Sequence, residues 1–260
     1  MNRRVVVTGT GVISPVGNNT STFWKNILDG VCGIDMIQSI PTDDLPVKIA
    51  GEVKDFVPAD YDIEAPFARK QDNFTLYAVA AAWQAVKASG LSSAEGGNID
   101  PLRFGVYVGS GIGGFTTQMR ESEKILNEGA KWVSPLFIPT MISNIAAGNI
   151  AIRNNACGPC LPVVTACATS THAIGEAFRA IKHGYADAVI AGGSEAAIIP
   201  LAVAGFANAK ASKGSPAIQR RRSTAWQPPP MIGSRSGGTR QPPAPPMFSI
   251  TIGWPKYFSA

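Results

Sequence analysis

Cys167 stands where the sequence changes from a strand pattern to a helix pattern. The residues before it read LPVVTA (161–166), which is typical of a buried strand, and those after it (168–183) favour a helix. The free N–H groups and the positive dipole end of a helix's first turn stabilise a thiolate and can hold an oxyanion. The junction therefore suits a covalent thiol nucleophile. Because cysteine is also among the most buried structural residues, position alone leaves a structural role equally open.

Two other arrangements of cysteine and histidine could do chemistry. The run Cys157-Gly158-Pro159-Cys160 resembles a thioredoxin redox motif, but that motif needs a helix starting at its first cysteine, and here LPVV follows. The set Cys157, Cys160, Cys167 and His172 matches no zinc spacing, and five helical residues place Cys167 and His172 about 140° apart. The same angle argues against His172 as the base for Cys167. We expect no metal site, and we expect His172 and His183 to be structural or surface residues.

The glycine-rich run GSGIGG (109–114) follows a predicted strand, as a phosphate-binding loop would. It lacks the Lys-Ser/Thr pair of a P-loop, and no acid lies at the spacing that a dinucleotide fold requires. We interpret it as a turn that brings backbone near a site. No cofactor is expected.

The elements that must position these residues alternate between strand and helix patterns. Strands are predicted at residues 4–8, 104–108, 161–166 and 186–191, with a tight turn after the first at Gly9 and Gly11. Helices are predicted at residues 19–29, 69–89 (stopped by Gly90) and 168–183, with Asn18 or Asn19 capping the first. This order indicates an α/β fold with a mixed, largely parallel sheet. The helix after Cys167 is small-sided nearly all round, which predicts burial on several faces.

The composition changes once, near Ser212. Residues 1–211 carry 16 Lys+Arg and 18 Asp+Glu, whereas residues 212–260 carry 7 basic residues, no acid and 9 prolines. Because proline fixes φ and lacks an N–H, we predict a folded domain at 1–211 and a disordered Pro/Arg-rich tail at 212–260. The basic balance of the chain belongs to this tail, which is solvated or, as an alternative, binds RNA or a membrane surface.

Hydropathy and cysteine content indicate the cellular compartment in which we expect the chain. Hydrophobic residues make up 45% and charged residues 16%, which suits a packed interior. No run reaches the ~18 apolar residues of a membrane span, and Gly9 and Gly11 break the opening apolar run too early for a signal peptide. Four unevenly scattered cysteines indicate reduced thiols. We expect a cytoplasmic protein, or a plastid one if a transit peptide is missing.

Five blocks then occur in the order found in the elongating β-ketoacyl-acyl-carrier-protein synthases, and the resemblance covers residues 3–211. They are VVVTGTGVISPVG at the start, GSGIGG, SPLFIPTMISN at 134–144, VVTACATSTHAIGEA around Cys167, and DAVIAGGSEAAI at 187–198. The resemblance implies the N-terminal half of a thiolase-like fold, with the nucleophile helix in a shared central layer.

It also implies a decarboxylative Claisen condensation in fatty-acid elongation. Cys167 matches the nucleophile, which accepts an acyl chain from acyl carrier protein and supplies one oxyanion donor through its own N–H. Ile112 in GSGIGG and Phe206 in VAGFANAK match positions that line the acyl pocket. Members bind carrier protein through basic surface residues and form homodimers; neither nucleic acid nor membrane is expected as a partner.

The resemblance calls for further catalytic residues that this chain does not supply. The family needs two histidines, a lysine and a glycine-rich gating loop from its C-terminal half, whereas this sequence has only His172 and His183. We therefore expect an incomplete chain, from a frame shift or a truncated gene, that is inactive in condensation. The alternatives are a non-catalytic acyl-binding or carrier-protein-binding protein and a fragment of a polyketide-type ketosynthase.

Overall fold

The computed structural model describes residues 3–209 and 247–253, and these form two compact units. Of the described residues, 3–13, 55–197 and 247–253 belong to the first unit, and 14–54 and 198–209 belong to the second. The predicted boundary at Ser212 lies outside the described residues.

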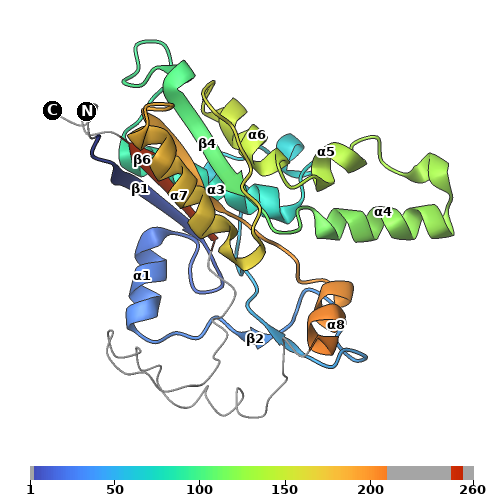
Figure 1. Ribbon diagram of the computed structural model, residues 1–260. Helices are drawn as coiled ribbons and strands as arrows, with labels where there is room; N and C mark the ends of the chain where they lie inside the picture. The colour runs from blue at the N-terminus through green and yellow to red at the C-terminus, as the bar shows by residue number, and fades with distance from the viewer. Residues whose placement is uncertain (1–2, 210–246, 254–260) are drawn as a thin grey trace. The chain divides into compact units, whose positions relative to one another are not determined.

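The first unit is built on a four-stranded mixed sheet, with strands in the order β1-β6-β5-β4 (Figure 1). Its strands are β1 (Val6–Ile13), β4 (Phe104–Gly109), β5 (Ala188–Gly193) and β6 (Met247–Gly253). β4 and β5 pair in parallel, and β6 runs antiparallel to both of its neighbours. The predicted α/β class with a mixed sheet is confirmed.

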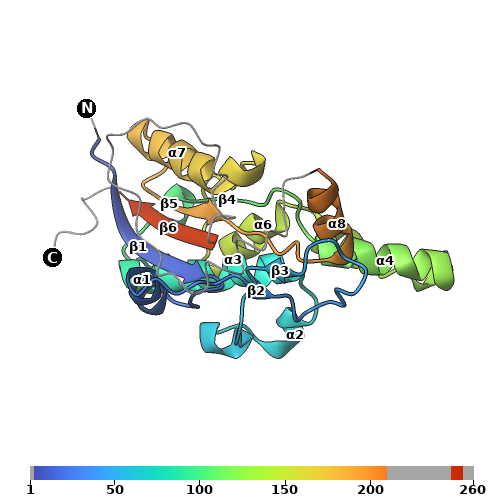
Figure 2. The same ribbon diagram turned by 90° about the horizontal axis from the view of Figure 1, so that it is seen from below.

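Helices cover both faces of this sheet (Figure 2). On one face lie α3 (Asn73–Ser89) against β1 and α6 (Ile145–Arg153) against β4, and on the other lies α7 (Thr169–Lys182). All of β4 and nearly all of β5 are buried, which explains why these strands read as continuous small or apolar runs.

β1 continues through the two glycines at which a tight turn was predicted, so that prediction is wrong. The reason is how closely α3 packs on the strand. A Cβ on Gly9 would lie 2.0 Å from the carbonyl oxygen of Ala85, and one on Gly11 would lie 1.9 Å from that of Ala81. The glycines therefore serve close contact between strand and helix rather than a turn.

The long helix predicted at residues 69–89 begins later, at Asn73. Asp72 is its N-cap, with extended backbone and a carboxylate that accepts the N–H of Phe74. Gly90 ends the helix in the left-handed conformation, with φ of 67°, as predicted.

The strand predicted at residues 161–166 is absent from the described sheet. The segment starts alongside β4, where Gly158 N–H donates to Phe104 O and Leu161 N–H donates to Val106 O. The recorded hydrogen bonds to β4 end at Leu161. Residues 161–165 continue without regular structure up to the Cys167 turn.

The prediction of a disordered tail does not hold for Met247–Gly253, because these residues form β6 between β1 and β5. Their sequence, MFSITIG, is rich in β-branched and aromatic residues, which favour strands. The proline and arginine content of the tail as a whole concealed this local pattern. The rest of the tail lies outside the described residues.

α7 is covered on one face only, whereas its small side chains predicted burial on several faces. Ala173, Ala177 and Ile181 pack against Tyr107 and Val189 of the sheet. Among the described residues nothing covers the opposite face, which exposes Thr171, His172 and Phe178.

The remaining elements of the first unit are short or lie at its side. They are η1 (Pro58–Tyr61), α2 (Ala65–Ala68), η2 (Pro101–Arg103), α4 (Phe115–Asn127), η3 (Ala130–Trp132), α5 (Phe137–Met141) and η4 (Ala166–Ala168). Figure 1 shows α4 and α5 extending away from the sheet. None of the helices in the described part of the chain is both long and apolar enough to cross a membrane.

The second unit holds α1 (Thr20–Leu28), the antiparallel pair β2 (Asp35–Met36) and β3 (Ile49–Ala50), and α8 (Pro200–Asn208). α1 matches its predicted range within a residue at each end. Of the two predicted caps, Asn18 and Asn19, the structure has Asn19, whose side chain accepts the N–H of Thr22 at 2.8 Å.

Candidate active site

The loops that follow β4 and β5 leave the sheet at the same edge. The two strands pair in parallel up to Gly109 and Gly193, and Ser194 N–H then donates to Gly109 O at 3.0 Å. The carboxyl ends of parallel strands are where α/β folds place their ligands. The GSGIGG loop and the turn after Gly193 are therefore held together at a position suited to a site.

Cys167 lies in a sharp turn, η4, between the extended segment and α7. Ala166, directly before it, has φ of 48°, a left-handed conformation that costs a residue with a Cβ about 1–3 kcal/mol. Two hydrogen bonds hold the turn. Thr165 N–H donates to Thr169 Oγ1 at 2.9 Å, and Ala168 N–H donates to Thr165 O at 3.0 Å. The turn presents Cys167 as an exposed free thiol just before α7 begins.

Glycines allow this turn to lie against the ends of the two strands. A Cβ on Gly109 would lie 1.9 Å from Val163 O and 2.7 Å from Thr169 Cγ2. A Cβ on Gly193 would meet Ser170 at 3.1 Å. Any larger residue at Gly109 would push the Cys167 turn away from the sheet.

The Glu195 carboxylate joins the GSGIGG loop to the turn after β5. Ser110 Oγ donates to Oε1 at 3.1 Å and Ile112 N–H donates to Oε2 at 3.1 Å. The N–H groups of Gly111 and Ala196 are further donors. Burial raises the pKa of Glu195 above its usual value, and the four hydrogen bonds act in the opposite direction.

The structure places the two predicted pocket residues in different units. Ile112 lies in the loop that Glu195 holds, with its side chain partly exposed. Gly111, beside it, is close to the Cys167 turn, since a Cβ there would lie 3.6 Å from Ala166 Cα. Phe206 belongs to the second unit, where it lies on α8 and is about half exposed.

The two cysteines of the CGPC segment and the two histidines lie outside the η4 turn. The hydrogen bonds of Gly158 and Leu161 to β4 keep the CGPC segment extended, and Cys157 Sγ lies 3.6 Å from Asn155 Oδ1. His172 and His183 are exposed, on and just after α7. In the described ranges no three His, Cys, Asp or Glu side chains are grouped so that they could hold a metal ion.

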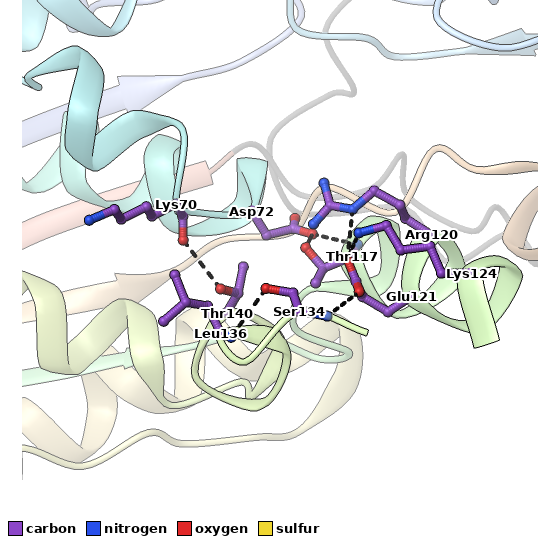
Figure 3. Close-up of polar contacts among 9 residues, drawn as sticks. All are labelled: Lys70, Asp72, Thr117, Arg120, Glu121, Lys124, Ser134, Leu136 and Thr140. Carbon is purple, nitrogen blue, oxygen red and sulfur yellow. Dashed lines mark hydrogen bonds and ion pairs between the residues drawn. The ribbon is translucent and has the colours of Figure 1, made fainter. Parts of the chain in front are cut away.

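Two buried carboxylates anchor the segment that contains the SPLFIPTMISN block (Figure 3). Asp72 Oδ2 accepts the N–H of Thr117 at 2.9 Å and its hydroxyl at 2.8 Å, which ties the start of α4 to the start of α3. Glu121 accepts the N–H of Ser134 at 2.8 Å and also contacts Arg120 and Lys124. The loop after α4 is thereby held against the helix.

We expect Glu121→Gln to lower the free energy of unfolding by about 1–3 kcal/mol at neutral pH, the cost of disturbing a buried charged acceptor. The Ser134 N–H and the cations of Lys124 and Arg120 lower the pKa of Glu121 from 4.5 to about 2, against the effect of burial. The contribution of the Glu121 charge to the free energy of unfolding is therefore complete above about pH 4.5 and is lost as the pH falls towards 2. Urea unfolding at pH 7 and at pH 3 measures it.

The control for this comparison is Glu123→Gln, on the exposed side of the same helix. It should change stability by less than about 0.5 kcal/mol at either pH. A difference between wild type and Glu121→Gln that stays constant from pH 7 to pH 3 would contradict the assigned contacts.

Comparison with known proteins finds a matching family and similar relatives. Residues 2–225 match the family described as "Beta-ketoacyl synthase, N-terminal domain". A 3-oxoacyl-[acyl-carrier-protein] synthase 2 from Staphylococcus aureus (strain COL) is 46% identical over 210 residues, which is 81% of this chain and 50% of that protein. The chain thus spans about half the length of the curated relatives it matches.

Solved structures show the same fold. A beta-ketoacyl synthase from Burkholderia phymatum STM815 superposes with a TM-score of 0.75 at 23% identity, covering 97% of this chain and 59% of that one. The ketosynthase of the AntDE:AntF complex, a type II polyketide enzyme bound to its acyl carrier protein, gives a TM-score of 0.71 at 24% identity, covering 99% and 65%. The predicted thiolase-like fold is confirmed.

Proposed function

Because this chain belongs to the beta-ketoacyl synthase family, we propose that Cys167 accepts an acyl chain from the thioester of acyl carrier protein. This transfer is the first half of the condensation that elongates a fatty acid. The observation that carries the proposal is the exposed thiol on a strained turn directly before α7, at the edge where β4 and β5 end. A structural cysteine would not need to be exposed there.

The transfer is a thioester exchange. The Cys167 thiolate attacks the acyl carbonyl, a new C–Sγ bond forms, and the carbonyl oxygen becomes an oxyanion. When the intermediate collapses, the bond to the carrier's sulfur breaks and the released thiolate takes up a proton. Backbone N–H groups at the start of α7 and the helix dipole are suited to stabilise the oxyanion.

Ile112 and Phe206 are proposed to contact the acyl chain, because they match the pocket-lining positions of the family. For Ile112 the position of its loop beside the Cys167 turn supports this role. Phe206 is proposed on the motif VAGFANAK alone.

The second half of the condensation needs two histidines to promote decarboxylation of the malonyl group. The two in this sequence, His172 and His183, are exposed on and after α7 and do not match those positions. We therefore propose acyl loading as the reaction of these 260 residues and expect no condensation from them alone. A homodimer in the cytoplasm is the proposed setting.

The test is covalent loading by acyl thioesters. The purified chain is incubated with hexanoyl-N-acetylcysteamine and with hexanoyl-carrier protein, and peptide mass spectrometry locates the adduct. One hexanoyl group is expected on Cys167, and Cys167→Ala should reduce loading at least ~100-fold, since the nucleophile is removed.

Cys160→Ala is the matched control, because Cys160 is also an exposed free thiol and should be dispensable. Loading that persists in Cys167→Ala, or that maps to Cys32, Cys157 or Cys160, would overturn the proposal. Reversible binding of the acyl group without an adduct would favour the non-catalytic alternative.

A further inference from the structure

The Glu195 carboxylate contacts both the loop after β4 and the turn after β5. It takes the Ser110 hydroxyl on one oxygen and the Ile112 N–H on the other, each at 3.1 Å. The N–H of Gly111 from the same loop and that of Ala196 from its own turn complete its donors. Ser110 Oγ in turn accepts the N–H of Gly113 at 2.9 Å.

These contacts fix where Ile112 lies. The loop 110–113 is held through three consecutive residues by one side chain, and Ser110 closes it internally. Gly111 has no Cβ, which would otherwise lie 3.0 Å from Glu195 Oε2 and 3.6 Å from Ala166 Cα. Gly111 therefore lies close both to the Glu195 carboxylate and to Ala166, the residue before Cys167, so that a shift of the carboxylate is expected to move the loop relative to the thiol.

We propose that Glu195 is a positioning residue that sets the acyl-chain selectivity of Cys167, by holding the 110–113 loop and with it Ile112 in place. The proposal rests on the proposed acyl loading of Cys167. Glu195 touches neither the thiol nor any reacting atom; it acts through the loop.

The chemistry of the side chain explains why glutamate is required. Both of its carboxylate oxygens are acceptors, and all four of its partners are donors. Glutamine has the same shape but replaces one acceptor oxygen by an NH₂ group. An NH₂ group on the side of the Ile112 N–H would face another donor, and one on the side of Ser110 would require the hydroxyl to turn and accept. In either case at least one of the loop's hydrogen bonds to residue 195 is lost or reversed.

The experiment compares acylation with simple alkylation of the same thiol. Rates of Cys167 loading from hexanoyl- and dodecanoyl-N-acetylcysteamine are measured beside the rate of alkylation by iodoacetamide. In Glu195→Gln the ratio of dodecanoyl to hexanoyl loading should change at least ~5-fold, whereas alkylation should stay within ~2-fold of wild type. Glu128→Gln, an exposed glutamate after α4, should leave all three rates unchanged.

Ser110→Ala provides an independent test. This variant removes the hydrogen bond from Ser110 to Glu195 and the acceptor of the Gly113 N–H. It keeps the hydrogen bond from Ile112 to Glu195. It should shift the ratio in the same direction as Glu195→Gln, by a smaller factor. If Glu195→Gln does not fold, as judged by circular dichroism, Ser110→Ala alone decides the result.

The outcomes separate this proposal from the one it rests on. If wild-type Cys167 takes up no acyl group, the proposed function fails. If wild type is loaded but neither variant changes the ratio, only the role of Glu195 fails. A parallel fall in alkylation and in both acylations would also overturn it, because that pattern indicates general loss of structure.

Discussion

Gly109→Ala is expected to lower the free energy of unfolding by about 1–3 kcal/mol or more and to reduce acyl loading of Cys167 at least ~10-fold. The new Cβ would lie 1.9 Å from Val163 O and 2.7 Å from Thr169 Cγ2. Neither atom is the end of a flexible side chain. The first is backbone, and the second belongs to the residue whose hydroxyl holds the turn at Thr165. Relief of the clash therefore has to move the Cys167 turn, and overpacking of this kind typically costs 1–3 kcal/mol or more.

Gly148→Ala is the matched control. Gly148 lies inside α6, and nothing is within 4 Å of a Cβ built there. Alanine in a helix interior is favoured over glycine by about 0.5–1 kcal/mol, so this variant should be at least as stable as wild type. Urea unfolding and the hexanoyl loading assay measure both variants. A Gly109→Ala protein with wild-type stability and loading would show that the turn does not pack on the end of β4 as described.

Local patterns predicted the elements that are set by neighbouring residues. Asn19, one of the two predicted caps, stands at the start of α1, and Gly90 stands at the end of α3 as predicted. Both could be predicted because a cap depends on the few residues around it. The glycines of β1 misled the prediction. In sequence they favour a turn, but in the structure they admit the backbone of α3, a helix that lies seventy residues further along the chain.

In the candidate site, too, local features could be predicted from the sequence and contacts between distant residues could not. The change from an extended segment to a helix at Cys167 was visible, because it is a local change of pattern. Glu195 gave no local signal beyond being an acid after two glycines. Its partners Ser110 and Ile112 lie more than eighty residues away, and only the parallel pairing of β4 with β5 brings them together. Contacts made across a sheet are set by topology, which a single sequence does not display.

The largest departure from the sequence-based prediction is β6, since the composition of residues 212–260 predicted a disordered tail. Instead, Met247–Gly253 occupies an inner position of the sheet. Its residues pair with β1 from Val6 to Ile13 on one side and with β5 from Ala188 to Gly193 on the other. Without it, β1 and β5 would each present an unpaired edge, and buried backbone groups that lose their partners cost about 1–3 kcal/mol each.

A chain ending at Pro246 is therefore expected to lose its cooperative thermal transition and to aggregate, whereas one ending at Gly253 should melt like the full chain. The second chain is the control, because it keeps every residue of β6. A point variant tests the same contact: Thr251→Pro removes an N–H in the middle of β6, opposite Gly9 and Ile190, and proline is not tolerated in inner strands. Thermal melts followed by circular dichroism, with sedimentation to detect aggregates, compare these three proteins with the full chain. If the chain ending at Pro246 melts at the same temperature as the full chain, the tail contributes nothing to the sheet, and the prediction from composition was the better one.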